Sequence, residues 1–396
     1  MTTLPTTVRR RRPMRTAAAV CALAVLPATA ALGTSNASAA APKPDAVVTM
    51  GDSFISGEGA RWLGNAEGLK NFGGIPQALR DTTDRVKTDG IALDKIYDAD
   101  CRRSDVAAIG GGAKKYNIAC SGAATAQLSR ATKGRVSQLQ QLRTLAKENN
   151  IKAVVLSVGG SDLKLTDTMK ACAEAWKNNR YCSTDVAFTS PVTKRMRTVS
   201  AKVERAVNEI TEVFRAAGST PRVIVQSYPM PLASGAAATT AAHDENGWDR
   251  WSAYGCPFYN RDLSWIDRTL GTGLNTELKK AADKTGADFV DLSRLLEGHQ
   301  VCGKARQTGF ASDGRSIYGP SAAKAEWARY LPRTKAALPA AEAQELLHPN
   351  YYGQQALGRC LTLVMSKLAM TAAGSDAQCR ATAGRSPRAV TVSYTS

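Results

Sequence analysis

The stretch VVTMGDSFISGEGARW, residues 47–62, places Ser53 directly after a short apolar run and before several small residues. A buried strand that stops at a serine, with glycines around it, leaves the hydroxyl accessible at the end of a sheet. Such a hydroxyl acts as a nucleophile when a base lies within hydrogen-bond reach and donors stabilise the oxyanion that forms on attack. The stretch therefore directs the search to residues that could serve Ser53 in acyl transfer.

The chain has three histidines, which keeps the search for a base short. His243 lies in a polar loop and His299 lies close to a cysteine, so we interpret both as ordinary surface or structural histidines. His348 follows Glu345 by three residues in ELLHPNYYG, and Pro349 disfavours helix at His348 itself. A carboxylate at that spacing can turn back to the imidazole Nδ1, fix its tautomer and stabilise the imidazolium. We therefore expect His348 to be the base and Glu345 to orient it.

Two further stretches offer donors for an oxyanion. NIACSGAAT places Gly122 where a backbone N–H can approach a ligand with no side chain in the way. LSVGGSDL ends a predicted strand in two glycines and Ser161, which exposes backbone amides and a hydroxyl. Taken singly, each stretch also fits an ordinary strand-to-helix turn. Together with the Ser53 amide, Gly122 and Ser161 are the expected oxyanion donors.

Short apolar, β-rich runs alternate with helical patterns along the chain. Apolar residues on one face, from Met196 to Phe214, predict a long amphipathic helix that ends at Gly218. Further helices are expected around LNTELKKAADKTG and after Asn350, which can cap the last helix. This alternation predicts an α/β fold with a parallel sheet and helices on both faces, which binds ligands beyond the carboxyl ends of its strands. The predicted strands are residues 46–50, 153–158, 222–228 and 287–292.

The first 40 residues are predicted to be a secretory signal peptide. Five arginines between residues 9 and 15 precede the apolar run TAAAVCALAVLPATAALG, and Ala37-Ser38-Ala39 supplies a small-residue cleavage pattern. The alternative, a membrane anchor, is disfavoured by Pro27 within the apolar run. No later segment is long and apolar enough to span a bilayer, so we expect a secreted, extracellular protein.

The remaining chain is predicted to form one domain, residues 41–375, followed by a C-terminal tail, residues 376–396. Three stretches carry cysteines, glycines and tryptophans with weak periodicity, and we interpret them as long disulfide-tied insertions over the site. These are residues 163–191, 232–262 and 303–344.

Eight cysteines remain after the predicted signal peptide, and an even number in an exported chain indicates disulfides. Eight cysteines allow 105 connectivities, and the sequence alone does not choose among them. Close spacing favours sequential pairing. A zinc site is the competing interpretation, but the chain has no CxxC and its histidines lie far from tight cysteine clusters. The eight are Cys101, Cys120, Cys172, Cys182, Cys256, Cys302, Cys360 and Cys379.

The chain is basic, with 52 lysines and arginines against 34 acidic residues. Without the five arginines of the predicted signal peptide the net charge is +13, which would favour anionic surfaces such as phospholipid or cell-wall polymers. The basic residues are scattered among acids, however, so most are interpreted as solvated faces. No basic stripe interleaved with aromatics points to nucleic acid, and we expect a monomer.

The order and spacing of these motifs resemble the SGNH/GDSL hydrolase family over about residues 45–370, with secreted actinobacterial esterases and lipases most similar. The carriers are GDS at 51–53, CRRS at 101–104, ACSGA at 119–123, GGSD at 159–162 and HPN at 348–350. The resemblance implies a flavodoxin-like three-layer α/β/α sandwich and hydrolysis of carboxylic esters without a metal or other cofactor. It also implies that Ser53 is the nucleophile, His348 the base and Gly122 a backbone oxyanion donor.

Two positions depart from the family pattern. Glu345 stands where the family has Asp, although some relatives orient the histidine with a backbone carbonyl. Ser161 stands where the family has an oxyanion asparagine, and its hydroxyl is a shorter donor. We interpret the chain as a secreted serine ester hydrolase acting on lipid or small acyl esters. The alternatives are a carbohydrate or cell-wall deacetylase and a catalytically inactive surface-binding protein on the same scaffold.

Overall fold

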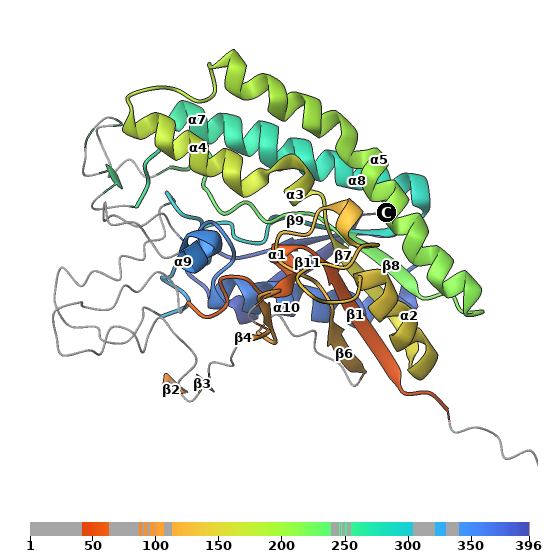
Figure 1. The fold of residues 1–396 in the computed structure, drawn as a ribbon. Helices are drawn as coiled ribbons and strands as arrows, with labels where there is room; N and C mark the ends of the chain where they lie inside the picture. Colours follow the sequence, from red (N-terminus) through yellow and green to blue (C-terminus); the bar gives the residue numbers. More distant parts are fainter. Residues whose placement is uncertain are drawn as a thin grey trace, which may run out of the picture. The chain divides into compact units, whose positions relative to one another are not determined.

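The centre of the fold is a seven-stranded sheet, seen in Figure 1 in a computed structural model of the chain. The structure describes residues 42–62, 87–88, 91–92, 96–98, 100–106, 113–238, 245, 247, 250–251, 255–303, 321–329 and 340–395. The strand order is β11-β10-β9-β8-β7-β1-β6. All neighbours pair in parallel except β10 and β11, which are antiparallel. The strands are β1 (Asp45–Gly51), β6 (Lys114–Asn117), β7 (Asn150–Ser157), β8 (Arg222–Gln226), β9 (Asp288–Arg294), β10 (Asp376–Arg380) and β11 (Thr391–Thr395).

The five strands β6-β1-β7-β8-β9 follow the flavodoxin order 2-1-3-4-5. The predicted α/β/α fold with a flavodoxin-like sheet is therefore confirmed. The four apolar runs became β1, β7, β8 and β9, whose central residues are buried. β6 escaped prediction because its sequence, KKYN, is short and polar, as suits the edge of a sheet.

Residues 376–395 differ from the expected tail. They form β10 and β11, an antiparallel pair that extends the sheet beyond β9. Ala377 and Cys379 point inward and are buried, while their neighbours along β10 are more exposed, so the strand carries a two-residue alternation. That pattern is only five residues long, too short to predict a strand against a polar background.

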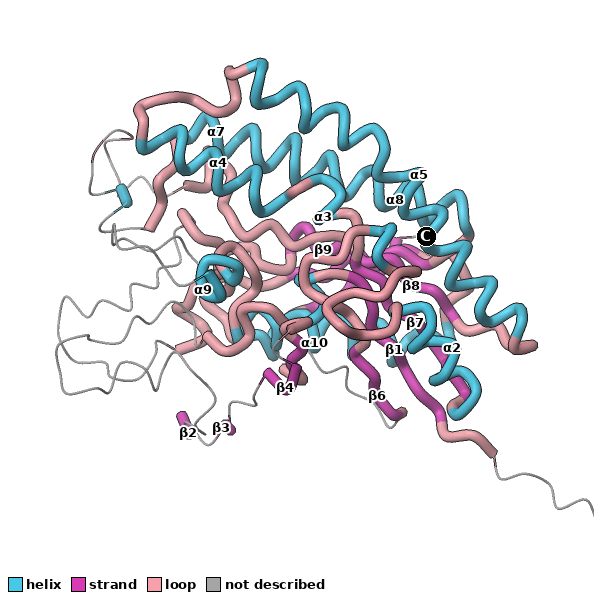
Figure 2. Tube along the Cα trace, viewed as in Figure 1, coloured by secondary structure: helices cyan, strands magenta, loops and turns pink. Residues whose placement is uncertain are grey.

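Helices cover both faces of the sheet (Figures 1 and 2). The long helix α5 (Val186–Ala216) packs against α8 (Gly273–Thr285) on one face, and α10 (Tyr351–Lys367) lies on the other. The predicted stripe of α5 is buried from Val199 to Phe214, and Asn350 caps α10 by accepting from two backbone N–H groups. Among the described residues the other helices of four or more residues are α1 (Ser53–Ser56), α2 (Gln138–Glu148), α3 (Gly160–Leu163), α4 (Leu165–Lys177), α7 (Asn260–Trp265), the π-helix η3 (Ile266–Thr272) and α9 (Ala340–Glu345).

All eight cysteines outside the predicted signal peptide are paired in disulfides, and the pairing is the sequential one. Zinc coordination by these cysteines is thereby excluded. The last pair joins α10 to β10, so it ties the unpredicted strand to the helix that follows the His348 segment. The pairs are Cys101–Cys120, Cys172–Cys182, Cys256–Cys302 and Cys360–Cys379.

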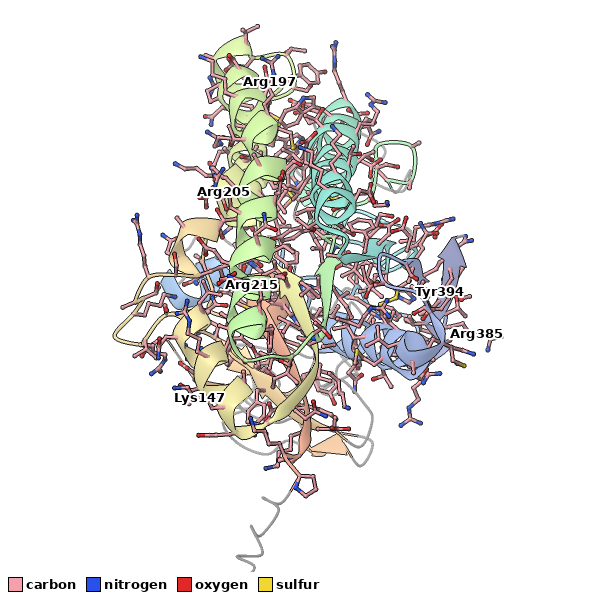
Figure 3. All side chains as sticks on the ribbon, turned by 90° about the vertical axis from the view of Figure 1, so that its right-hand side faces the viewer. Lys147, Arg197, Arg205, Arg215, Arg385 and Tyr394 are labelled. Carbon is pink, nitrogen blue, oxygen red and sulfur yellow. A yellow bond between two sulfur atoms is a disulfide. The ribbon has the colours of Figure 1, made fainter. Side chains whose placement is uncertain are left out.

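The basic side chains are spread over the surface. Arg197, Arg205 and Arg215 lie along α5 in Figure 3, and all three are exposed. Acidic residues alternate with them, and Glu212 forms an ion pair with Arg215 at 2.7 Å. This mixture agrees with the interpretation of the positive charge as a solvated face. In the described part of the chain no helix combines the length and the apolar character needed to cross a membrane.

Candidate active site

Ser53 lies just beyond the carboxyl end of β1, the edge at which parallel sheets bind ligands. The turn before it needs glycine: Gly51 has a φ of 128°, and a Cβ there would lie 1.8 Å from the carbonyl oxygen of Ser157 in β7. Asp52 then caps α1 by accepting a hydrogen bond from the Phe54 N–H at 3.2 Å. The nucleophile turn is thus pressed against the neighbouring strand.

His348 reaches Ser53 from the segment between α9 and α10. Its Nε2 lies 2.7 Å from Ser53 Oγ, and its Nδ1 lies 3.1 Å from the carbonyl oxygen of Leu346. A carbonyl oxygen can only accept, so the proton is on Nδ1 and the lone pair of Nε2 faces the serine hydroxyl. The His348 carbonyl accepts from the Arg329 N–H at 2.8 Å, which holds this backbone in place. The geometry suits transfer of the Ser53 proton to Nε2.

A second glycine lets these two segments meet. Gly59 has a φ of 84°, and a Cβ there would lie 2.7 Å from the Pro349 carbonyl oxygen and 3.4 Å from His348 Cβ. Any side chain at Gly59 would therefore push the histidine segment away from the nucleophile turn. The GEG that follows Ser53 in the sequence has a clear packing reason.

Glu345 does not take the expected position. Its carboxylate is fully buried and accepts two hydrogen bonds from the Arg61 guanidinium, at 2.7 and 2.8 Å, and one from Trp62 Nε1 at 2.7 Å. Arg102 lies 3.6 Å away. A bidentate guanidinium is a stronger partner for a carboxylate than a neutral imidazole, and the Leu346 carbonyl already occupies the Nδ1 side of His348. The arrangement is a Ser53–His348 dyad with a backbone carbonyl as the orienting group.

Burial lowers the pKa of His348 to about 3, with a smaller contribution from the Lys170 ammonium. The imidazole is therefore neutral at physiological pH, which is the form that can accept a proton. The same burial makes the imidazolium costly to form, and the carbonyl at Nδ1 is neutral and offers it no counter-charge.

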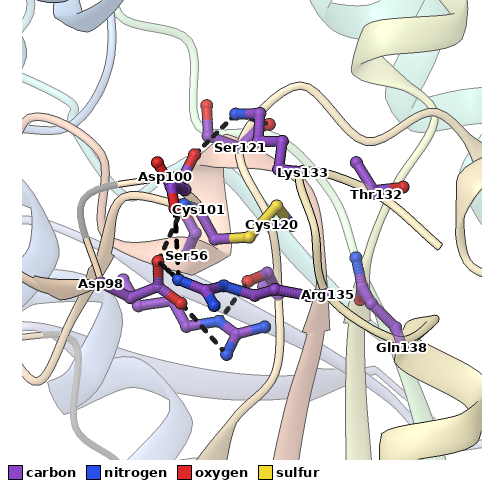
Figure 4. Close-up of a disulfide and its surroundings, with 12 residues drawn as sticks. Ser56, Asp98, Asp100, Cys101, Cys120, Ser121, Thr132, Lys133, Arg135 and Gln138 are labelled. Atoms are coloured by element: carbon purple, nitrogen blue, oxygen red, sulfur yellow. Dashed lines mark hydrogen bonds and ion pairs between the residues drawn. A yellow bond between two sulfur atoms is a disulfide. The ribbon is translucent and has the colours of Figure 1, made fainter.

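The Gly122 loop is fixed by a disulfide and by two lysine contacts, shown in Figure 4. Cys120 pairs with Cys101, and Lys133 Nζ donates to the carbonyl oxygens of Ser121 (2.9 Å) and Asp100 (2.7 Å). No described residue accepts a hydrogen bond from the Gly122 N–H. The amide therefore remains available to a ligand in the cavity that Gly122 lines.

Ser161 lies in α3, directly after the carboxyl end of β7. Its neighbour Asp162 accepts from Thr125 N (2.8 Å) and Thr125 Oγ1 (3.0 Å), which ties this turn to the loop that carries Gly122. Lys202 of α5 pairs with the same carboxylate at 3.1 Å. The two expected oxyanion segments are thus held side by side.

A buried tyrosine joins the nucleophile turn to the same region. The Tyr228 hydroxyl donates to Asp52 and accepts from the Gly160 N–H at 2.9 Å. Burial raises the pKa of Asp52 to about 7, against the lowering effect of the Tyr228 and Phe54 hydrogen bonds. Neither Tyr228 nor the role of Asp52 was predicted. The two residues are far apart in the sequence and meet only because the sheet brings their strands together, so no local sequence pattern indicates the contact.

Around these groups is a cavity of about 280 Å³. Ser53, His348, Gly122 and Ser161 all line it, so the structure brings the expected nucleophile, base and oxyanion donors to one place. Phe54 and Leu165 are the large apolar residues among its described lining. Most of the remaining lining is polar or charged, including Lys164, Asp167, Lys170 and Gln344.

Glu58 is the main residue of the site that sequence reasoning missed. It is fully buried, lines the cavity, and accepts a hydrogen bond from the Ser121 hydroxyl. Burial raises its pKa to about 7, and its Oε2 lies 3.8 Å from His348 Nε2. The sequence does contain a signal for Glu58, which lies between two glycines in the GEG at residues 57–59. An acidic residue in such a buried turn is unusual.

The other histidines do not contribute to this cavity's described lining. His299 is buried, stacks on Trp327 with ring centroids 3.8 Å apart, and approaches the Ala325 carbonyl oxygen with Nδ1 at 2.8 Å. Its structural interpretation is therefore supported. His243 lies outside the described residues.

Comparison with known proteins finds similarity to lipases. No family model matches the chain. Over 288 residues the chain is 26% identical to Lipase 2 of Streptomyces coelicolor, a match that covers 69% of this chain and 80% of that protein. Among solved structures, it is similar to an extracellular lipase of Streptomyces rimosus, with 20% identity, a TM-score of 0.46, and coverage of 81% of this chain and 99% of that one. It is also similar to phospholipase A1 of Streptomyces albidoflavus NA297, with 17% identity, a TM-score of 0.47, and coverage of 82% and 99%.

The curated similarity agrees with what the residues and the sheet already indicate, and the protein is a carboxylic ester hydrolase. The motifs around Ser53, Gly122, Ser161 and His348 occur in family order and meet at the edge of a flavodoxin-like sheet. In these motifs and in its sheet the chain resembles the SGNH/GDSL hydrolase family.

Proposed function

We propose that the protein hydrolyses carboxylic esters through an acyl-enzyme on Ser53, with His348 as the base. The observation that carries the proposal is the 2.7 Å contact between Ser53 Oγ and the unprotonated Nε2 of His348. Ser53 attacks the ester carbonyl while His348 takes its proton, and the Ser53 and Gly122 amides stabilise the oxyanion with help from Ser161. His348 then protonates the leaving alcohol and activates water for deacylation.

We further propose that the substrates are esters with short acyl groups. A cavity of about 280 Å³ is at the small end of ligand sites, and Phe54 and Leu165 offer limited apolar surface to an acyl chain. The name of the curated relative, a lipase, supports acyl esters in general. The polar lining also favours a second candidate, removal of short acyl groups from carbohydrate or cell-wall esters.

Secretion is part of the proposal. The predicted signal peptide at residues 1–40 and four disulfides in the rest of the chain support export to an oxidising environment. The part after the signal peptide is proposed to act as a monomer, with no nucleic-acid partner.

The test is hydrolysis of a p-nitrophenyl ester series from acetate to decanoate, with Ser53→Ala and His348→Ala as variants. Each variant should lower kcat by several orders of magnitude, and the double variant should be little worse, because the two residues act as a unit. Losses that multiply would overturn the dyad. A rate that rises with chain length through decanoate would overturn the short-acyl proposal, and a wild type inactive on every ester, including acetylated sugars, would favour a surface-binding protein.

A further inference from the structure

Glu58 is a buried carboxylate that the proposed mechanism does not use. It lies two residues after the end of α1, and its backbone N–H donates to the Ser53 carbonyl oxygen at 3.3 Å, so its position is fixed relative to the nucleophile. One carboxylate oxygen, Oε2, accepts from the Ser121 hydroxyl. The other, Oε1, is buried and has no hydrogen-bond partner among the described residues. A carboxylate held this way in the wall of a catalytic cavity is costly, and its retention needs a reason.

The His348 imidazole, which becomes charged during the reaction, provides that reason. When His348 takes the Ser53 proton it becomes a buried imidazolium, and its Nδ1 partner is the neutral carbonyl of Leu346. Glu345 cannot supply a charge at Nδ1 because its carboxylate is bound to Arg61 and Trp62. Glu58 Oε2 lies 3.8 Å from Nε2, close enough for an opposite charge to stabilise the imidazolium.

We propose that ionised Glu58 is the counter-charge of the His348 imidazolium and acts from the Nε2 side, in place of the usual carboxylate at Nδ1. It is a positioning residue: it touches the base and not the ester. The inference rests on the proposed Ser53–His348 mechanism and adds the group that makes a carbonyl-oriented histidine an effective base.

The Ser121 hydroxyl supports this arrangement. It donates to Glu58 and accepts from Gln344 Nε2 at 2.7 Å, while the Ser121 backbone is held by the disulfide at Cys120 and by Lys133. The donated hydrogen bond favours the charged form of the carboxylate. Six charged or titratable groups surround Glu58. They are Asp52 and Glu345, which oppose its ionisation; Arg102 and Lys133, which favour it; and Lys170 and His348.

The proposal predicts a distinctive pH profile. The pKa of Glu58 is raised to about 7 by burial, while that of His348 is lowered to about 3, so on acidification Glu58 takes up a proton well before His348 does. The wild-type kcat/KM should therefore fall as pH drops through about 7, although His348 itself stays neutral. In Glu58→Gln that acidic limb should be absent. Its kcat/KM at pH 8 should be about 10- to 100-fold below wild type, as expected for losing a charge that shifts the pKa of the base by about 1–2 units, and the two enzymes should converge near pH 5.5.

Thermal unfolding separates this role from a structural one. A carboxylate whose folded pKa is raised above its unfolded value destabilises the folded state increasingly as pH rises from about 4.5 to about 7. Glu58→Gln should therefore melt a few degrees higher than wild type at pH 8 and be less active at the same time. A residue that only supported the fold would lose stability and activity together. Glu345→Gln is the matched control, since it removes another fully buried carboxylate near the site; it should keep the acidic limb, moved to lower pH because a charge that opposes Glu58 ionisation is lost.

Ser121→Ala gives an independent arm that keeps the carboxylate. Loss of the donated hydrogen bond raises the pKa of Glu58, so the acidic limb should move to higher pH by about one unit while the alkaline plateau is retained. The proposal would be overturned if the acidic limb near pH 7 persisted in Glu58→Gln, as titration of Asp52 would produce. It would also be overturned if the limb kept its wild-type pH in Ser121→Ala. Full activity of the Ser53→Ala variant would instead overturn the Ser53–His348 mechanism on which the Glu58 proposal rests.

Discussion

Glu345→Gln tests whether the histidine is oriented by a backbone carbonyl. The substitution keeps the shape of the side chain but removes the charge that accepts two hydrogen bonds from Arg61 and one from Trp62. One of the amide positions would then confront the Arg61 guanidinium with a second donor. Removing one partner of a buried ion pair costs about 3–5 kcal/mol, and the low end applies because the Arg61 side chain is 15% exposed.

The assay combines unfolding with kinetics. A unit that spans Lys43–Ser396 unfolds with an entropy of about 0.7 kcal/mol/K, so a loss of about 3 kcal/mol lowers Tm by about 4 °C. The kcat/KM at 25 °C should stay within about threefold of wild type, because Nδ1 of His348 keeps the Leu346 carbonyl. Glu297→Gln is the control: its bidentate pair with Arg294 is exposed, so its Tm should change by less than about 1 °C. A hundredfold loss of kcat/KM with an unchanged Tm would refute the carbonyl-oriented dyad and restore Glu345 as the orienting residue.

Two further predictions concern the oxyanion donors and the disulfides. Ser161→Ala should lower kcat about tenfold with little change in KM, which is less than the 10²–10³ loss expected for a well-placed donor. Ser161→Asn should keep kcat at the wild-type value or raise it. A wild-type rate in the alanine variant would mean that the Ser53 and Gly122 amides form the oxyanion hole without Ser161. Mass spectrometry of the non-reduced mature protein should find no free thiol, and reduction should lower Tm because each bridge is worth about 2–5 kcal/mol; eight titratable thiols in the native protein would contradict the pairing.

The parts of the fold that the sequence predicted are those with strong local patterns. β1, β7, β8 and β9 are apolar runs buried on both faces, and the stripe of α5 repeats with helical spacing over many turns. β6 and the β10–β11 pair escaped because these strands are short and half polar, so their pairing is decided by the neighbouring strand. The disulfide pairing could be anticipated because short loops favour neighbours, although spacing alone does not prove it.

At the site, sequence reasoning succeeded with Ser53 and His348 because each has a recognisable neighbourhood, and it failed where partners come from distant segments. Glu345 is three residues from His348, but Arg61 competes for its carboxylate from nearly 300 positions away. Proximity in sequence made the histidine the obvious partner. The Arg61 guanidinium, which presents two donors in a plane, is a stronger partner for the carboxylate than the imidazole. No residue near Glu345 in the sequence indicates this pairing.

Three loops at the carboxyl edge of the sheet carry the site, and buried side chains tie each to the next. Tyr228 joins Asp52 of the nucleophile turn to Gly160 after β7, and Asp162 joins that turn to Thr125 beyond the Gly122 loop. Because these ties are buried hydrogen bonds, they work in a low dielectric and restrict the loops more than exposed ion pairs would. A backbone amide can stabilise an oxyanion only if its distance from the nucleophile is fixed before the reaction. The ties fix that distance without a charged side chain among the expected oxyanion donors, while the Glu58 carboxylate, 3.8 Å from His348 Nε2, serves the imidazolium.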